Sequence, residues 1–352
     1  MQKISAKGES RGLKEGRMNK IFSGVPIHKY VYITGILAGK KVGDQYVLRR
    51  REYMLLPLYP LLFLWGVFLY WRTKRQEIQR LKGAQYQYKL AMVAIAKNEA
   101  PYIAEWLAFH KLQGVEVVFL YDNDSTDNMR AVLEPFIADG FVKYNVIHGA
   151  VKQFEAYTDA INQYGALCKY MAFIDCDEFL VPMAAEDRLL DLIESAFAKD
   201  VNVGGVGVNW CIYGSAGHEQ KPEGLVIEHF NTHAKADFCG NDSIKSIVKP
   251  SCVAYFEHAH YPKYKRGFYP INLQGKYCPS WWNVITAFDG MRVNHYICKS
   301  KEEYVARRKM GKADDGLVRP LKDFYDNDRN EEKDTIMVRY IDDVKHLMAE
   351  YK

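Results

Sequence analysis

The stretch that decides the fold is "FIDCDEFLVP", residues 173–182. An apolar lead is followed by three acids, Asp175, Asp177 and Glu178, and then by a second apolar run. Side chains two residues apart on a strand point to the same side, so Asp175 and Asp177 would repel each other unless a cation lies between them. Oxygen ligands of this kind suit Mg²⁺ or Mn²⁺. The stretch therefore predicts a buried strand that ends at a metal site, with Glu178 supporting that site from behind.

The sequence before this stretch alternates short apolar runs with segments of helical spacing. We predict strands in the apolar runs that begin at residues 90, 115 and 141, and helices at residues 100–114, 128–140 and 153–165. Such alternation is typical of βαβ units. It predicts an α/β fold, with a mostly parallel sheet covered by helices on both faces.

Polar clusters follow three of these strands, at the point where each strand ends. They are Lys97–Glu99, Asp122–Ser125 and Asp175–Glu178. In an open α/β sheet, ligands bind outside the carboxyl ends of the strands, so the three clusters are expected to form one site. The alternative is that Asn, Asp and Ser serve only as turn and helix-cap residues.

Several motifs in this order resemble nucleotide-sugar glycosyltransferases of the GT-A (Rossmann-like) fold, and most closely the group that includes glycosyltransferase family 92 and its bacterial family-2-like relatives. The motifs are "AIAKNEAPYIAEWLAFHKLQGVEVVFLYDNDSTDN", "FIDCDEFLVP", "NWCIYGSAGH" and "VNHYICKSKEEYVARRKMG". The resemblance covers residues 90–312. The set of motifs in this order is specific, whereas no single motif is.

The resemblance implies a set of site residues. Asp175 and Asp177 match the D-x-D motif, which holds a divalent ion (Mn²⁺ or Mg²⁺) on the donor diphosphate, and His295 matches a histidine that joins the metal shell. The implied nucleotide-binding residues are Asn98, Glu99, Asp122, Asn123, Ser125 and Asp127. Lys299 and Arg307 are candidate diphosphate contacts, with an ordinary solvated helix face as the alternative.

The implied activity is transfer of a sugar from a nucleotide-sugar, expected to be a UDP-sugar, to a hydroxyl of a glycan or glycolipid acceptor in polysaccharide or lipopolysaccharide synthesis. If the anomeric centre is inverted, a carboxylate must deprotonate the acceptor hydroxyl. Glu219 and Asp237 are alternative candidates for this base. Two other readings stay open: an inactive nucleotide- or sugar-binding membrane scaffold, and a nucleotidyl- or phosphotransferase. A nucleotidyl- or phosphotransferase would be expected to contain a glycine-rich "GxxxxGK[ST]" phosphate loop, and the sequence lacks this loop.

The N-terminal quarter of the chain differs from the rest in charge. Residues 1–90 carry 18 Lys and Arg against 5 Asp and Glu, a net charge of +13. We expect a basic, loosely ordered tail over residues 1–52 and an uncharged membrane-spanning or membrane-dipping helix over 53–71, with a buried core helix as the alternative. A charged connector over 72–89 and a charged, helical, peripheral tail over 313–352 complete the expected organisation. The apolar run favours a membrane over nucleic acid as the partner of the basic arm.

Two features favour the cytoplasmic side of a membrane as the location of the catalytic domain. The seven cysteines are odd in number and contain no CxxC pair, as expected for reduced thiols. The triplet Asn123-Asp124-Ser125 is an N-glycosylation acceptor inside the expected nucleotide loop, where a glycan would block the donor. The alternative is a single-pass protein with its catalytic domain in the Golgi lumen.

Overall fold

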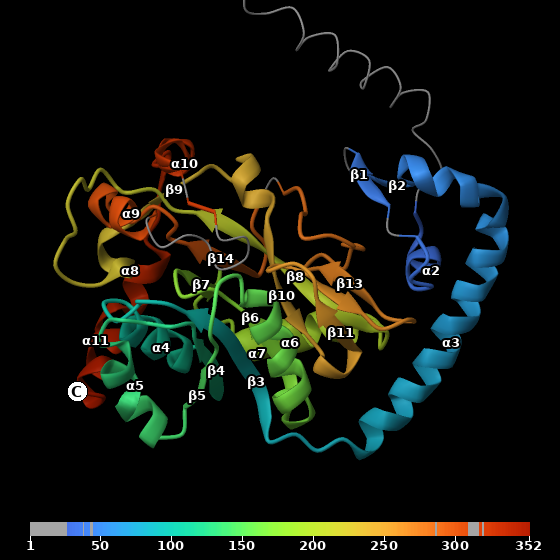
Figure 1. Ribbon diagram of the computed structural model, residues 1–352, viewed down its shortest axis with the longest axis horizontal. Helices are drawn as coiled ribbons and strands as arrows, with labels where there is room; N and C mark the ends of the chain where they lie inside the picture. The colour runs from blue at the N-terminus through green and yellow to red at the C-terminus, as the bar shows by residue number, and fades with distance from the viewer. Residues whose placement is uncertain (1–26, 38, 43–44, 286, 309–316, 319) are drawn as a thin grey trace, which may run out of the picture.

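The computed structural model describes residues 27–352 except 38, 43–44, 286, 309–316 and 319. The expected tail over residues 1–26 lies outside this range. A nine-stranded sheet forms the centre, with eight strands in the order β5-β4-β3-β6-β10-β8-β14-β7 and β13 paired with β8. Figure 1 shows this sheet with helices packed around it.

The first half of the sheet is parallel, as the sequence predicts. It consists of β3 (Tyr88–Ala96), β4 (Val117–Asp122), β5 (Val142–Val146) and β6 (Cys168–Phe173). Ala96 of β3 is level with Asp122 of β4, so these two strands end at the same edge.

The second half makes the sheet mixed. It consists of β7 (Glu178–Pro182), β8 (Val203–Ile212), β10 (Ile244–Val248), β13 (Tyr269–Asn272) and β14 (Met291–His295). Strand β10 lies antiparallel between β6 and β8, and β7 lies antiparallel to β14. The prediction of a mostly parallel α/β sheet is therefore confirmed for the first half, and antiparallel pairs join and close the second.

Helices cover both faces of the sheet. One face is covered by α4 (Ile103–Leu112), α5 (Met129–Ala138), α7 (Leu189–Ala198) and α11 (Ile341–Glu350), and the other by α6 (Gln153–Tyr164) and the hairpin of β11 (Val253–Phe256) and β12 (Pro262–Tyr264). Along β3, Met92 and Ala94 face the first layer while Ala91 and Val93 face the second. This alternation explains why the strand reads as a continuous apolar run.

The remaining elements are short. They are η2 (Gly165–Leu167), α8 (Val226–His229), β9 (Thr232–His233), η3 (Cys239–Asp242), η4 (Pro250–Cys252), α9 (Lys301–Arg308), α10 (Leu321–Asn327), β15 (Glu332–Lys333) and η5 (Ile336–Tyr340).

The described part of the C-terminal segment is helical in places but is not the peripheral tail expected from its charge. Val344 of α11 is fully buried in the main core, and the ring of Tyr351 stacks on Phe136 at a centroid distance of 4.0 Å. Asp334 also forms an ion pair with the buried Arg292. The charged residues of α11 face solvent, while its apolar residues recur every three or four positions and pack against the core beside α4.

The described part of the N-terminal segment is also more ordered than the expected loose tail. It forms α2 (Lys29–Tyr32), β1 (Lys40–Val42), β2 (Gln45–Val47), the 3-10 helix η1 (Arg50–Leu58) and α3 (Tyr59–Gly83). A small separate core holds it together, built from Ile27, Val31, Leu37, Leu48 and Leu62.

The apolar run over residues 53–71 is divided between η1 and α3, and α3 continues into the expected connector as far as Gly83. Pro57 lies inside η1, where no regular α-helical hydrogen bonds are lost, and Pro60 lies in the first turn of α3, where proline is tolerated. Arg50–Gly83 is the one helical segment in the described residues that is long and apolar enough to cross a membrane, and 17% of its most apolar window is buried against protein. Length and composition alone do not establish a span.

Candidate active site

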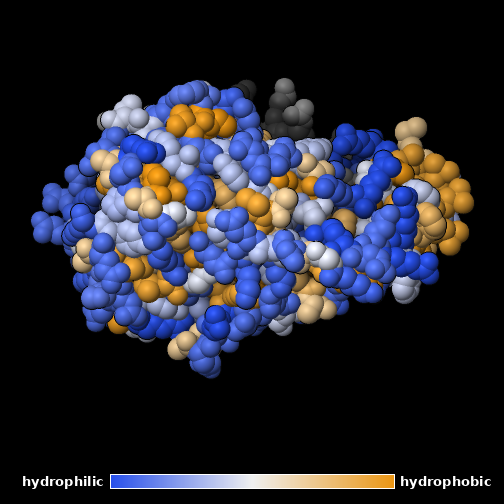
Figure 2. All heavy atoms as spheres, turned by 90° about the horizontal axis from the view of Figure 1, so that it is seen from below, coloured by the Kyte–Doolittle hydropathy of each residue, from blue (hydrophilic) through white to orange (hydrophobic). Residues whose placement is uncertain are grey.

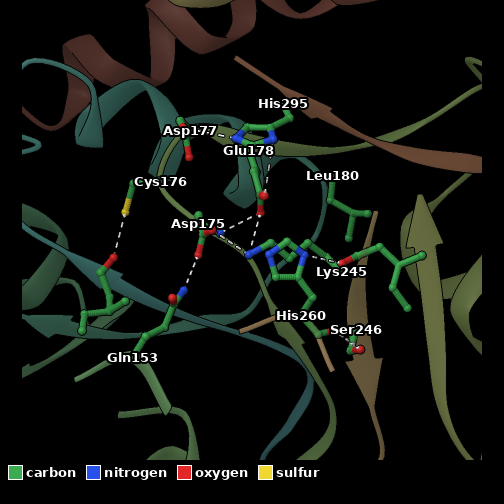
Figure 3. A network of polar contacts seen from close by, with 12 residues as sticks. Gln153, Asp175, Cys176, Asp177, Glu178, Leu180, Lys245, Ser246, His260 and His295 are labelled. Carbon is green, nitrogen blue, oxygen red and sulfur yellow. Dashed lines mark hydrogen bonds and ion pairs between the residues drawn. The ribbon is translucent and has the colours of Figure 1, made fainter. Parts of the chain in front are cut away.

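The D-x-D motif lies in the turn between β6 and β7, at the carboxyl end of the parallel strands. The Glu178 N–H donates to the Asp175 carbonyl at 3.0 Å and closes this turn. Strand β14 pairs with β7 so that His295 lies opposite Glu178, and the Tyr296 N–H donates to the Asp177 carbonyl at 2.9 Å. The site therefore combines the end of β6 with a strand more than a hundred residues later in the chain (Figure 3).

Asp177 is 2% exposed and is held by two basic groups. Its Oδ2 lies 2.5 Å from Arg307 Nη1, on α9, and 3.3 Å from His295 Nε2. Burial by itself would raise the pKa of Asp177, but the charge of Arg307, with His295 beside it, holds that pKa well below its usual value. Burial lowers the pKa of His295, so its imidazole is neutral at pH 7. Asp177 is therefore an ionised carboxylate in a buried, basic setting.

Asp175 is held by a different cation. Lys245 Nζ, on β10, lies 2.7 Å from Asp175 Oδ2 and 3.3 Å from Glu178 Oε2, and the Lys245 side chain is fully buried. Gln153 Nε2 and the Tyr157 hydroxyl donate to Asp175 Oδ1 at 2.9 and 3.0 Å. Burial would lower the pKa of Lys245, but the two facing carboxylates hold it above its usual value. The Lys245 ammonium therefore stays charged at neutral pH.

The two aspartates are thus paired with different basic side chains, Asp175 with Lys245 and Asp177 with Arg307. Among the described residues, no three His, Cys, Asp or Glu side chains converge closely enough to hold a metal ion. The kinds of donor atom nevertheless fit Mn²⁺ or Mg²⁺, because the carboxylates of Asp175 and Asp177 lie in one turn and the neutral imidazole of His295 lies beside Asp177. In addition, Glu178 Oε1 and His295 Nδ1 are buried 4.0 Å apart, and neither has a hydrogen-bond partner among the residues that the structure describes. Polar atoms left in this state indicate a site that is completed by a further group.

A cavity of about 390 Å³ lies beside Asp177, between the loop after β3 and helix α9. Its polar lining includes Asn98, Glu99, Tyr102, Lys221, Lys299, Glu302, Glu303 and Arg307. Lys299 and Lys221 lie over the Tyr102 ring, at 4.0 and 4.7 Å from its centroid. The volume is in the range of small-molecule pockets, and Arg307 connects the cavity to the D-x-D motif.

Charges in this region nearly balance. Four carboxylates, of Glu99, Asp175, Asp177 and Glu178, face three cations, of Lys245, Lys299 and Arg307. Burial raises the pKa of Glu99 and, more strongly, that of Glu178. The cluster is therefore close to neutral before any ligand enters.

The structure gathers the six expected nucleotide-binding residues at one edge of the sheet, and several of their side chains fix the loops there. Asn98 Oδ1 accepts from the Thr126 N–H at 2.7 Å, and the Asn98 N–H donates to Ser125 Oγ at 3.0 Å. Asp122 accepts from the Ser125 N–H and from the Tyr144 hydroxyl, at 2.9 and 2.6 Å. These contacts are those of turn-forming residues, the alternative that the sequence left open.

The other three residues of that set behave differently from one another. Asn123 Nδ2 donates to the carbonyls of Ile147 and Gly149, and Asp127 accepts from the Ala100 N–H. Glu99 lines the cavity and is buried near Lys299 and Arg307. A role of all six in binding a nucleotide stays a prediction, and Glu99 has the surroundings that fit it best.

The two candidate bases lie on the surface. The Glu219 side chain is 75% exposed and pairs with Lys301 at 3.2 Å, next to the rim of the cavity. Asp237 is exposed on the loop before η3. Their catalytic role stays a prediction.

The residues of the site that sequence reasoning missed include Gln153, Tyr157, Lys245 and Lys221, together with Tyr102, Glu302 and Glu303 of the cavity lining. Lys245 could have been identified from the sequence, because it interrupts the apolar strand "SIKSIV". A charged side chain buried in a strand requires a partner of opposite charge. Gln153 and Tyr157 carried none, since polar residues four apart are ordinary on a helix.

The known proteins to which the chain is similar in sequence include several that are named as glycosyltransferases. The chain is 26% identical over 189 residues to the glycosyltransferase family 92 protein RCOM_0530710 of Ricinus communis, covering 53% of this chain and 33% of that one. It is 29% identical over 154 residues to beta-1,4-galactosyltransferase galt-1 of Caenorhabditis elegans, covering 38% and 34%. It therefore spans about a third of the length of these curated relatives.

Among solved structures, S. aureus TarS 1–349 in complex with UDP-GlcNAc is similar with a TM-score of 0.36 and 11% identity, over 75% of this chain and 71% of that one. A score of this size does not by itself assign the fold. The sequence profile of glycosyltransferase family 92 matches residues 92–277, which include the second half of β3, the D-x-D motif and β10. Since this match covers more than half of the chain, the protein belongs to glycosyltransferase family 92.

Proposed function

We propose that the protein transfers a sugar from a nucleotide-sugar to a hydroxyl group of a glycan or glycolipid, with inversion at the anomeric carbon. The observation that carries this proposal is the D-x-D pair at the carboxyl edge of the parallel strands. Each aspartate is fixed by its own cation, and a 390 Å³ cavity with two further basic groups adjoins the pair. Membership of family 92 supports the same reaction class.

The residues around the cavity suit the departure of a nucleoside diphosphate. Lys299 and Arg307 line the cavity on the side of Asp177 and are positioned to contact phosphate oxygens. Negative charge grows on the diphosphate as the glycosidic bond breaks, and fixed cations in a buried setting stabilise that charge. Lys245 cannot reach solvent, so its part is to hold Asp175 and Glu178 in place.

The donor diphosphate adds negative charge to a cluster that is already nearly neutral, which favours binding of Mn²⁺ or Mg²⁺ along with it. Asp175, Asp177 and His295 would hold the ion, which supplies Lewis-acid neutralisation of the leaving phosphate. His295 is suited to this because burial keeps its imidazole neutral, with a lone pair free for ligation.

We propose a UDP-sugar as donor, and the name of the relative galt-1, a beta-1,4-galactosyltransferase, supports transfer of a hexose. The acceptor base is proposed to be Glu219 or Asp237, brought to the acceptor when donor and acceptor bind. Polysaccharide or lipopolysaccharide synthesis on the cytoplasmic face of a membrane is the proposed setting, with the Golgi lumen as the alternative.

The decisive experiment compares wild type with Asp177→Asn in nucleotide binding and in turnover. With Mn²⁺ and UDP, GDP or CMP in turn, we expect one nucleotide to raise the wild-type melting temperature. A ligand at a hundred times its Kd adds about 2.7 kcal/mol, or roughly 5–10 °C for a domain of this size. Asp177→Asn should stay folded, lose this rise and release no nucleoside diphosphate from a sugar-nucleotide.

The matched control is Asp191→Asn, at an exposed aspartate on α7. It should behave as wild type. Undiminished turnover by folded Asp177→Asn would overturn the assignment of the site. Nucleotide binding by wild type without any sugar transfer would favour the inactive scaffold instead.

A further inference from the structure

The outward face of η1 and α3 carries a continuous row of large apolar side chains, here called the apolar stripe. Its members are Met54, Leu58, Leu61, Leu64, Trp65, Phe68 and Trp71, and each is between 43% and 86% exposed. The five on α3, from Leu61 to Trp71, are spaced so that they lie along one side of that helix, and Met54 and Leu58 extend the apolar surface onto η1. Figure 2 shows this apolar surface gathered at the end of the molecule where α3 lies. A patch of this kind on a soluble surface marks an interaction site.

The opposite face of α3 is fixed to the rest of the protein. Gly66 packs on the backbone of Tyr30, so closely that an added Cβ would lie 1.6 Å from the Tyr30 carbonyl oxygen. The Tyr70 hydroxyl donates to Asp200 at 2.8 Å, and Asn202 Nδ2 donates to the Tyr70 carbonyl at 3.1 Å. These contacts orient the apolar stripe relative to the catalytic body.

Exposed charges around the stripe are all positive. Over residues 49–83 the exposed charged residues are Arg49, Arg50, Arg51, Arg72, Arg75 and Lys82. The two acids of this segment, Glu52 and Glu77, are buried: Glu52 accepts from backbone N–H groups, and Glu77 forms an ion pair with Arg80. The surface thus presents an apolar strip with cations at both ends.

We propose that this surface docks flat on a bilayer leaflet that contains anionic lipids, with α3 lying in the plane of the membrane. Apolar side chains would enter the boundary of the acyl chains while the flanking arginines contact headgroup phosphates. The fit is specific to one face, as expected for an interfacial helix.

A spanning helix would require the same segment to contact lipid on all sides. It would have to give up the hydrogen bonds of Tyr70 with Asp200 and Asn202, or carry these polar groups into hydrocarbon. Lys29, on α2, lies 3.9 Å from Asp200 and would be displaced with them. In-plane docking leaves every one of these contacts intact.

A second copy of the chain is a poorer occupant than a membrane. Two copies packed stripe to stripe would bring arginine clusters of the same sign together, which costs free energy. Anionic headgroups neutralise the same clusters.

Docking in this way also restrains the catalytic body. Helix α3 ends at Gly83 and the central strand β3 begins at Tyr88, so a short connection joins the membrane surface to the sheet. This inference stands on α3 alone and does not depend on the proposed transfer reaction.

The binding test uses the full chain with vesicles of phosphatidylcholine, with and without about a third of phosphatidylglycerol. Wild type should float with the anionic vesicles. Leu64→Glu/Phe68→Glu should lower the bound fraction at least about tenfold, because two charges would enter the apolar boundary. The control Leu112→Glu/Val146→Glu changes two exposed apolar residues elsewhere on the body and should bind as wild type. Equal melting temperatures of the variants confirm that both are folded.

The orientation test labels single cysteines with a membrane-impermeant maleimide in sealed membranes from expressing cells. Cys239 is the one exposed cysteine, so Cys239→Ser gives a silent background into which Arg50→Cys or Gln79→Cys is added. In-plane docking predicts that both positions react from the same side of the membrane.

Reaction of the two positions from opposite sides would establish a span and overturn the proposal. Unchanged vesicle binding by Leu64→Glu/Phe68→Glu would also refute it. So would a lipid-free wild-type dimer that this variant converts to a monomer, combined with no vesicle binding by wild type. None of these readouts involves nucleotide or sugar transfer, so failure here is distinguishable from failure of the proposed activity.

Discussion

Replacement of Lys245 by methionine tests whether its ammonium is what makes the acidic turn stable. Methionine keeps most of the length and volume of the side chain, so packing in β10 changes little. The variant leaves Asp175 and Glu178 facing each other without their shared cation. Both lie within ion-pair distance of Lys245 Nζ, at 2.7 and 3.3 Å, and neither the Lys245 nor the Glu178 side chain has any solvent exposure.

The expected loss is large because the site is buried. Removing one partner of a buried ion pair costs about 3–5 kcal/mol, since the remaining charge has lost its compensation. For a body of this size that corresponds to a fall of roughly 6–20 °C in Tm. Part of the loss should be regained at lower pH. Burial already raises the pKa of Glu178, and without Lys245 it rises further, so the folded variant takes up a proton and is stabilised as pH falls through that pKa.

The assay is thermal unfolding of wild type and Lys245→Met at pH 8 and pH 5.5. The control is Lys263→Met, at a surface pair with Glu257 whose N–O distance is 3.9 Å and whose side chains are 37% and 56% exposed. Such a pair contributes less than about 1 kcal/mol. A double variant, Lys245→Met/Glu178→Gln, should recover part of the lost stability. If Lys245→Met loses no more than Lys263→Met at pH 8, the reasoning about the buried cluster is wrong.

Three further predictions concern pH, packing and metal. His110 accepts the Leu180 N–H at Nε2 and donates from Nδ1 to the Trp106 carbonyl, so it must stay neutral, and burial lowers its pKa to about 3. Its folded pKa lies below the unfolded value, so stability should fall as pH drops below about 6.5, by up to about 1.4 kcal/mol per pH unit, and less steeply in His110→Gln in a melting series. Gly66→Ala should force α3 away from Tyr30, at a cost of about 1–3 kcal/mol, and limited proteolysis should then cut residues 27–48 faster. Chelation of divalent ions should abolish sugar transfer, and added Mn²⁺ should restore it; full activity in chelator would contradict the proposed ion.

How far the sequence predicts the site depends on whether a residue's environment is local. The sequence locates the strand ends near Glu99, Asp122 and Asp175, because each apolar run stops at polar residues and local periodicity is enough to show this. The sequence does not decide whether Asn98 and Asp122 fix loops or bind a ligand, since the same residue types do both. The sequence could not predict that Lys245 and Arg307 pair with the aspartates, because these partners come from distant parts of the chain.

By itself, the sequence determined the parallel βαβ half of the sheet, the edge at which the site lies and the pair of aspartates. These follow from hydrophobic spacing and turn chemistry over short windows of the sequence, which do not depend on long-range contacts. Only the tertiary structure decided that β10 inserts antiparallel beside β6 and delivers Lys245, and that α9 delivers Arg307. It also decided which face of α3 is covered by protein and which is left apolar and exposed. The physical reason is the same in each case: burial is a property of pairs of elements far apart in the chain, and no local pattern states which pair will form.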